Sequence, residues 1–183
     1  MNQLLPLFVV IPLLTAFLVM IFGRLLKNFS KYLSSSILLL LMCTSFYLLI
    51  SHDGNPQVYK VGGWQPENGI PIGIYMVADS FNLIILCVIN LIGFLSVIYS
   101  ISYIDRFTSV SYYYALFCLM IAGMSGVVLS GDLFNIFVFL EISVIASYAL
   151  VAFGVEKNEL EASFKYQVLG GIASFLILFG IGF

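Results

Sequence analysis

Residues 133–146 read Leu133-Phe134-Asn135-Ile136-Phe137-Val138-Phe139-Leu140-Glu141-Ile142-Ser143-Val144-Ile145-Ala146, and they are the most informative part of the chain. The stretch is apolar apart from a few polar side chains, and it keeps one carboxylate, Glu141, near its centre. A charge in the middle of a bilayer-length helix costs about 2.5–3.5 kcal/mol on insertion scales. A chain that retains such a residue is expected to use it, most often to hold or pass an ion.

The composition of the whole chain is that of a membrane protein. Hydrophobic residues make up 62% of its 183 residues, and charged residues make up only 9%. Ordinary soluble domains are about 45–50% apolar and about 25% charged. We therefore predict an integral membrane protein with one domain, residues 1–183. The net charge of −2 gives no indication of a nucleic-acid partner.

Six apolar stretches are long enough to cross roughly 30 Å of hydrocarbon as helices. They cover residues 4–22, 33–50, 80–103, 112–129, 133–153 and 164–183. The short alternating segments of a membrane barrel are absent from the sequence. The predicted fold class is therefore all-α, with six transmembrane helices. Residues 51–79 are expected to form an ordered external loop, with Tyr59 and Trp64 at the membrane interface.

Basic residues predict the orientation in the membrane. Three connections on one side hold most of them: Arg24, Lys27 and Lys31, then Arg106, then Lys157. The other side holds Lys60. The positive-inside rule places the Arg24, Arg106 and Lys157 loops in the cytoplasm and both termini outside the cell membrane.

Several chemistries are excluded by residue usage. Cys43, Cys87 and Cys118 lie in three different spans, so they form neither a disulfide framework nor a spaced metal site. His52 is the single histidine, which rules out a haem held by two helical histidines. No glycine-rich phosphate-binding loop is present. We expect no catalytic residue, metal or cofactor, so in an enzyme complex another subunit would perform the chemistry.

The remaining candidates are polar groups within the spans. Glu141 lies about 12 Å along a helix that begins at Leu133, near the midplane. Tyr148, seven residues on, shares its face. An acid at this depth either pairs with a cation or takes up a proton, and either arrangement suits a proton site.

Other polar residues admit two interpretations. Asp132 is expected to cap the helix that follows it, with ion binding as the alternative. Lys165 either extends to the interface or lies within the sixth span. Asn90 is expected to make an interhelical hydrogen bond rather than contact an ion.

These residues resemble a known family. Gly131-Asp132-Leu133-Phe134-Asn135-Ile136-Phe137-Val138-Phe139-Leu140-Glu141-Ile142, followed by Ala146-Ser147-Tyr148, resembles the fifth-helix signature of antiporter-like membrane subunits. Similar subunits occur as the D-type component of Mrp-type Na+/H+ antiporters, in membrane-bound hydrogenases and in the proton-translocating arm of complex I. The segments Glu161-Ala162-Ser163-Phe164-Lys165-Tyr166, Val61-Gly62-Gly63-Trp64 and Ala78-Asp79-Ser80 resemble other parts of the same pattern.

The resemblance implies roles that the residues alone do not show. In the family, the glutamate matching Glu141 is a proton-pathway residue that pairs with a lysine on the seventh helix, and Lys165 matches a lysine of the sixth. The family fold has about fourteen helices, with two inverted repeats. This chain resembles helices one to six of that fold and stops at Phe183. We therefore expect another polypeptide, or a longer chain, to supply the missing helices.

The resemblance leads to one functional hypothesis and one alternative. The chain would contribute an intramembrane acid to a proton or Na+/H+ path in a multisubunit antiporter, hydrogenase or quinone reductase, with other membrane subunits and lipid as partners. The alternative is a scaffold helix bundle of such a complex that transports nothing. An autonomous small channel fits less well. Whether the exported ion is H+ or Na+ stays open, because a lone carboxylate suits either.

Overall fold

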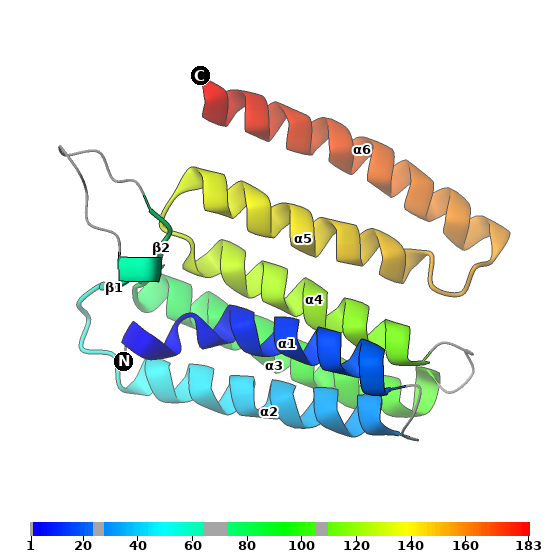
Figure 1. Cartoon of the computed structure of the whole chain (residues 1–183), viewed down its shortest axis with the longest axis horizontal. Helices are drawn as coiled ribbons and strands as arrows, with labels where there is room; N and C mark the ends of the chain where they lie inside the picture. Colours follow the sequence, from blue (N-terminus) through cyan, green and yellow to red (C-terminus); the bar gives the residue numbers. More distant parts are fainter. Residues whose placement is uncertain (1, 24–27, 64–72, 105–109) are drawn as a thin grey trace.

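Six α-helices dominate the computed structural model, which describes residues 2–23, 28–63, 73–104 and 110–183 (Figure 1). In chain order the helices are α1 (Leu7–Phe22), α2 (Phe29–Ile50), α3 (Ser80–Tyr103), α4 (Val110–Leu129), α5 (Leu133–Val151) and α6 (Lys157–Gly182). The described elements also include two short strands, β1 (Gln57–Lys60) and β2 (Tyr75–Ala78), and two 3-10 turns, η1 (Asn2–Leu4) and η2 (Val61–Gly63).

Helices α2 to α6 are each long and apolar enough to cross a membrane. Helix α1 is also apolar but has 16 residues. It is preceded by Pro6 and the η1 turn, which shorten the continuous helix at that end. The nearly all-helical membrane fold predicted from the sequence is confirmed.

The helices are arranged as a bundle with two further helices laid against one side (Figure 1). Helices α1, α2, α3 and α4 pack together, α5 packs on α4, and α6 packs on α5 as the outermost helix. The N terminus, both strands, the α4–α5 turn and the C terminus lie at one end, here called the hairpin end. The links from α1 to α2, from α3 to α4 and from α5 to α6 lie at the opposite end.

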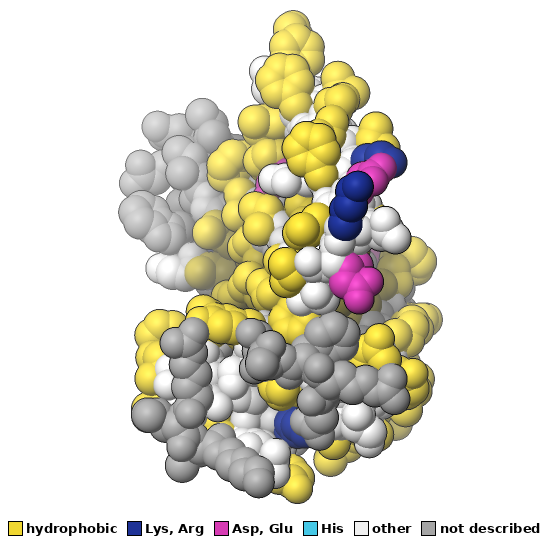
Figure 2. Space-filling view, turned by 90° about the vertical axis from the view of Figure 1, so that its right-hand side faces the viewer, with side chains coloured by type: hydrophobic (Ala, Val, Ile, Leu, Met, Phe, Trp, Pro, Cys, Tyr) yellow, Lys and Arg dark blue, Asp and Glu magenta, His cyan; other side chains and the backbone are white. Residues whose placement is uncertain are grey.

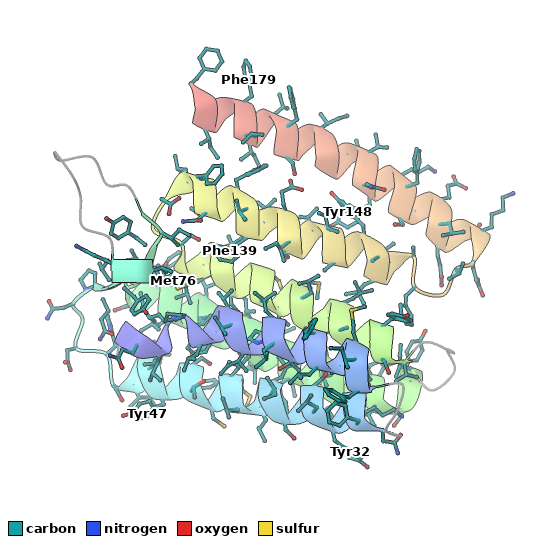
Figure 3. The ribbon with its side chains drawn as sticks, viewed as in Figure 1. Tyr32, Tyr47, Met76, Phe139, Tyr148 and Phe179 are labelled. Atoms are coloured by element: carbon teal, nitrogen blue, oxygen red, sulfur yellow. The ribbon has the colours of Figure 1, made fainter. Side chains whose placement is uncertain are left out.

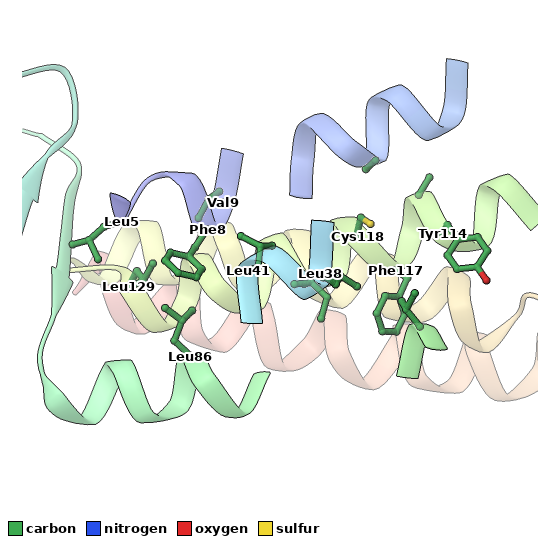
Figure 4. Packing of buried hydrophobic residues seen from close by; sticks show 14 of the residues in the cluster. Leu5, Phe8, Val9, Leu38, Leu41, Leu86, Tyr114, Phe117, Cys118 and Leu129 are labelled. Carbon is green, nitrogen blue, oxygen red and sulfur yellow. The ribbon is translucent and has the colours of Figure 1, made fainter. Parts of the chain in front are cut away.

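The best-packed part of the molecule is the α1–α4 bundle. Its fully buried side chains include Phe8, Leu38, Leu41, Leu86 and Leu129 (Figure 4). Within a bilayer the lipid is as apolar as these side chains, so close van der Waals packing holds the helices together rather than escape from water. Leucines spaced along each helix and small residues where two helices meet make this packing possible.

Helices α4 and α5 approach closely because two positions of α4 carry no side chain. A Cβ atom added at Gly123 would lie 2.6 Å from the backbone nitrogen of Ser143, and one added at Gly126 would run into the ring of Phe139. The short Ser130–Asp132 turn makes the two helices antiparallel neighbours. This contact fixes the position of α5, which carries Glu141.

The loop between α2 and α3, predicted to be external, contains a β-hairpin that was not expected from the sequence. Strand β1 pairs antiparallel with β2, with Lys60 opposite Tyr75. The hairpin is joined to the α4–α5 turn, because the backbone N–H of Gly131 donates to the carbonyl oxygen of Tyr75 at 2.8 Å. The run Tyr75–Ala78 is apolar throughout, so it lacks the alternation of apolar and polar residues that indicates a strand. Trp64, expected at the interface, lies outside the described residues.

Two helices begin earlier than the hydropathy pattern suggests. Helix α6 starts at Lys157, seven residues before the predicted start at 164, behind a reciprocal capping box between Glu156 and Glu159. Helix α2 starts at Phe29 rather than at residue 33, and so it includes Lys31. Hydropathy marks only the apolar part of a helix, whereas these helices continue through polar turns at their ends.

Lys31 therefore belongs to a helix rather than to a loop. It is 8% exposed, and its Nζ donates to the carbonyl oxygen of Ile101, 3.2 Å away, in the last turn of α3. A cation at this place complements the negative end of a helix. Arg24 and Arg106, which carry the orientation argument with it, lie outside the described residues.

Candidate functional site

The position of Glu141 follows from the way α5 begins. Asp132 is the N-cap of this helix, and its carboxylate accepts a hydrogen bond from the backbone N–H of Asn135 at 2.8 Å. Glu141 lies eight residues after Leu133, or about 12 Å along the axis. In a helix of 19 residues this is close to the middle.

The side chain of Glu141 lies on the side of α5 that faces away from α4. Phe139 and Ser143 contact the glycines of α4, and Glu141 is two residues from each, which turns it by about 200° around the helix. The residue is half-buried, and its Oε1 atom is buried with no hydrogen-bond partner among the described residues. A buried carboxylate oxygen without a donor calls for a proton or a cation from outside this part of the chain.

Tyr148 points toward α6 (Figure 3). It follows Glu141 by seven residues, so helical periodicity sets the two on the same face of α5. Two helical turns, about 10.5 Å, separate the two residues along α5. The Tyr148 ring meets the Tyr166 ring edge to face, with centroids 4.7 Å apart. Its hydroxyl oxygen packs directly on Gly170 of α6, where any Cβ atom would collide with it. Like the Glu141 oxygen, this hydroxyl is buried and has no hydrogen-bond partner in the described ranges.

Lys165 lies away from Glu141 in this structure. Its Nζ atom pairs with Oε1 of Glu161 at 2.6 Å, one turn earlier on α6, and the two side chains are 68% and 57% exposed. Charged side chains gather at this end of the molecule, over the first turns of α6 (Figure 2). The sequence left the choice between an interfacial and a buried lysine open, and here the lysine is exposed.

The register between α5 and α6 gives the separation of Glu141 and Lys165 along the helix axis. Ser163 donates to the carbonyl oxygen of Tyr148 at 2.8 Å, and Gly170 receives the Tyr148 hydroxyl. Because the helices are antiparallel, these two contacts place Glu141 level with residues 170–177. Lys165 is at least five residues from that level, about 7.5 Å along the axis.

Ser174 is a residue at this level that was not among the candidates from the sequence. Among the residues of α6, all of which the structure describes, it alone is buried. It follows Gly170 by four residues, so it shares the face that meets α5. Its signal in the sequence is a small polar residue one turn from a glycine in an otherwise bulky apolar helix.

The described residues contain no group of three or more His, Cys, Asp or Glu side chains able to hold a metal ion. Cys87 and Cys118 are buried in different helices, and Cys43 is exposed. An apolar cavity of about 530 Å³ lies between α1, α4 and the end of α5, and neither Glu141 nor Tyr148 is among its lining residues. The arrangement on the outer face of α5, a carboxyl and a phenol with buried oxygen atoms, suits the exchange of a proton.

Comparison with known proteins gives one consistent result. Residues 130–183 match the family described as "NADH:quinone oxidoreductase/Mrp antiporter, TM". The chain is 30% identical to the D-type component of the Na(+)/H(+) antiporter of Alkalihalophilus pseudofirmus, over 100% of this chain and 36% of that protein. It is 33% identical to the N-type component of the NADH-quinone oxidoreductase of Desulforudis audaxviator, over 97% of this chain and 35% of that protein.

Solved structures agree with these sequence matches. A chain of the membrane-bound sulfane sulfur reductase, an archaeal respiratory membrane complex, superposes with a TM-score of 0.88 at 33% identity, over 97% of this chain and 36% of that one. A chain of the Mrp complex from Dietzia sp. superposes with a TM-score of 0.81 at 28% identity, over 98% and 33% of the two chains. The chain therefore spans about a third of the length of the relatives it matches.

Proposed function

This chain matches the antiporter-like family of membrane subunits, and we propose that it contributes Glu141 to a proton or Na+/H+ translocation path in a multisubunit membrane complex. Its relatives are subunits of antiporter and oxidoreductase complexes, so a part of an ion-translocating membrane complex is the role they share. The observation that carries the finer proposal is the buried Oε1 atom of Glu141, which finds no donor in the described part of the chain.

The chemistry asked of Glu141 is reversible protonation. When an ammonium group lies near it, the carboxylate keeps its charge, and when that group moves away, the acid takes up a proton. In the structure Lys165 is exposed and bound to Glu161, so the cation that faces Glu141 comes from elsewhere in the complex. The driving energy comes from a redox partner or from the gradient of a second ion.

Tyr148 extends the site along the α5–α6 contact. Its hydroxyl is buried on the same face as Glu141, two turns nearer the opposite end, where α6 begins. A phenol can both donate and accept a hydrogen bond, so it can pass a proton without carrying a charge. Lys165 then lies near the end of the proposed proton path from Glu141 through Tyr148, where its ammonium can exchange protons with water.

The partners follow from the exposed outer helices. The proposal requires further membrane helices over α5 and α6, like those of the longer relatives, supplied by a continuation of this polypeptide or by other membrane subunits. It also places the α1–α2, α3–α4 and α5–α6 links in the cytoplasm and the hairpin end outside, in keeping with the basic residues in those links or in the first turns of the helices that follow them.

Substitution of Glu141 by Gln tests the function, because the amide keeps the size of the side chain but cannot exchange a proton. In membrane vesicles that contain the assembled complex, we expect Glu141→Gln to reduce coupled proton movement at least tenfold, measured with a pH-sensitive dye, while complex assembly on native gels is unchanged. Glu141→Asp, which keeps the acid, is expected to retain part of the activity.

Asp53→Asn is the matched control, because Asp53 is an exposed carboxyl in the link between α2 and β1. It is expected to leave both assembly and transport unchanged. If Glu141→Gln assembles and pumps like Asp53→Asn, the transport role is wrong and the chain is a scaffold bundle of the complex.

A further inference from the structure

Two fully buried polar atoms on α3 and α4 have no hydrogen-bond partner among the described residues, and they lie apart from Glu141. The Oδ1 atom of Asn90 and the Oγ atom of Ser125 are buried in residues that are both 0% exposed. Neither atom has a hydrogen-bond partner in the part of the chain that the structure describes. Leaving such atoms unpaired in an apolar interior costs free energy, so a partner is expected.

The register between α3 and α4 brings the two residues to the same level. Near the opposite end, Ser100 donates to the Tyr114 hydroxyl at 3.2 Å. Closer to the hairpin end, a Cβ atom on Gly93 would lie 2.8 Å from the Ile121 side chain. The helices are antiparallel, so about one more turn of each leads from Gly93 to Asn90 and from Ile121 to Ser125.

The hydrogen bond of the Asn90 amide shows which of its two ends is the nitrogen and which is the oxygen. Its Nδ2 atom donates to the carbonyl oxygen of Leu86 at 2.8 Å, one turn earlier on the same helix. A carbonyl only accepts, so the nitrogen must occupy that side of the amide. The oxygen is thereby directed away from its own backbone, as an acceptor in need of a donor.

Ser125 differs from other hydroxyl residues of these helices. Thr15, Ser45 and Ser147 each donate to a carbonyl oxygen of their own helix at 2.8 Å. Such back-bonding is the usual way for a serine to satisfy its hydroxyl in an apolar helix. The Ser125 hydroxyl does not use it, and so it is free to bond across the helix interface.

The surroundings of the pair favour a neutral ligand. The buried residues described here include no Asp or Glu, and the charged residue among them, Lys31, lies at the opposite end of α2. A metal cation without a carboxylate would pay a large desolvation penalty in this interior. A water molecule carries no net charge and needs two or more polar partners when it is buried.

From these observations we infer that Asn90 and Ser125 hold an internal water molecule between α3 and α4. The water donates one hydrogen bond to Asn90 Oδ1. With the Ser125 hydroxyl it forms a second hydrogen bond, in which either group can be the donor. The two groups are thereby satisfied without a direct bond between them. Because Gly126, next to Ser125, contacts Phe139, this site is at about the depth of Glu141 but separated from it by α5.

A high-resolution map of the assembled complex that contains this chain tests the inference. We expect a density peak at about 2.7–3.2 Å from both Asn90 Oδ1 and Ser125 Oγ. A direct Ser125–Asn90 bond, or a Ser125 hydroxyl turned back to its own helix with no peak between the residues, overturns the proposal.

Hydroxyl-radical labelling by X-ray radiolysis gives a second readout, because bound water generates radicals where bulk water does not reach. Leu86, fully buried beside Asn90, is expected to be labelled in the unaltered complex. The double variant Asn90→Leu with Ser125→Ala removes both polar groups, and it is expected to lower that label at least fivefold while the complex still assembles.

Ser130→Ala is the matched control, because the Ser130 hydroxyl already bonds to the Gly126 carbonyl oxygen at 2.8 Å. It is expected to leave the Leu86 label unchanged. An unlabelled Leu86 in the unaltered complex, or a label that persists in the double variant, contradicts the proposal.

Discussion

At the residue scale, Glu141 and Lys165 differ in their burial and in their hydrogen-bond partners. The glutamate has an oxygen buried without a donor in the described residues, whereas the lysine is exposed and paired with Glu161. An exposed ion pair one turn apart on a helix contributes only about 0.3–0.5 kcal/mol, and salt screens it. Lys165 therefore does little for the stability of this chain, so an effect of removing it on transport would report its role in the proton path.

We predict that Lys165→Ala changes the free energy of unfolding by less than about 0.5 kcal/mol. In vesicles that contain the complex, the same variant is expected to slow coupled proton movement several-fold, because the proposed path loses its titratable group at the end where α6 begins. Lys157→Ala is the control, since Lys157 is also exposed on the first turn of α6. Equal transport by the two variants would remove Lys165 from the path.

At the scale of elements, the contact between α5 and α6 depends on one aromatic side chain and one glycine. The Tyr148 ring packs against Tyr166, and its hydroxyl occupies the space that a side chain at Gly170 would need. Gly171, the next residue, has open space where its Cβ atom would lie. Helical glycines that look alike in the sequence therefore have different functions in the packing.

We predict that Gly170→Ala destabilises the α5–α6 contact by about 1–3 kcal/mol, the usual cost of overpacking. Gly171→Ala is expected to be neutral or slightly stabilising, because alanine is the better helix former. Tyr148→Phe removes the hydroxyl that the new methyl group meets first, so it should recover part of the loss when combined with Gly170→Ala.

Thermal unfolding of the three variants and the pair in one lipid nanodisc gives the coupling energy between the two positions. If the effects of Gly170→Ala and Tyr148→Phe simply add, the two groups do not touch as the structure shows.

At the scale of the whole molecule, burial falls steadily from the bundle to its outer edge. Helix α4 is buried over much of its length, α5 much less, and α6 at Ser174 alone. Large apolar side chains on α6, among them Phe164, Leu169 and Phe175, are exposed. Lipid or further helices cover such a surface in a membrane, and the relatives have about three times the length of this chain.

The proposed sidedness of the bundle can be measured with cysteine variants. Asp53→Cys lies at the hairpin end and Lys157→Cys at the opposite end. We expect a membrane-impermeant maleimide to label Asp53→Cys in intact cells and Lys157→Cys only after the membrane is opened, because the basic links face the cytoplasm. The unaltered chain, with its three cysteines inside helices, gives the background. The reverse labelling pattern would invert the orientation.

The helical membrane fold, the α4–α5 turn and the family could all be predicted from the sequence. Each of these depends on local information: apolar runs long enough to span a bilayer, a glycine and an aspartate at a helix junction, and a motif of consecutive residues around Glu141. The hairpin could not be predicted, because four-residue strands form only through pairing with each other and with the α4–α5 turn. The predicted start of α6 was too late, because hydropathy does not register a helix that continues through charged turns.

Which polar groups meet depends on the tertiary packing. The sequence indicated Glu141, Tyr148 and Lys165 together. Helical periodicity already sets the first two on one face of α5, whereas the packing of α6 covers the Tyr148 hydroxyl and leaves the lysine exposed with Glu161. The α3–α4 register sets Asn90 level with Ser125, a residue that was not a candidate from the sequence. Helical periodicity fixes the face of each residue, whereas the rotation and register of two packed helices depend on side chains along their whole contact, and these are settled only when the helices pack.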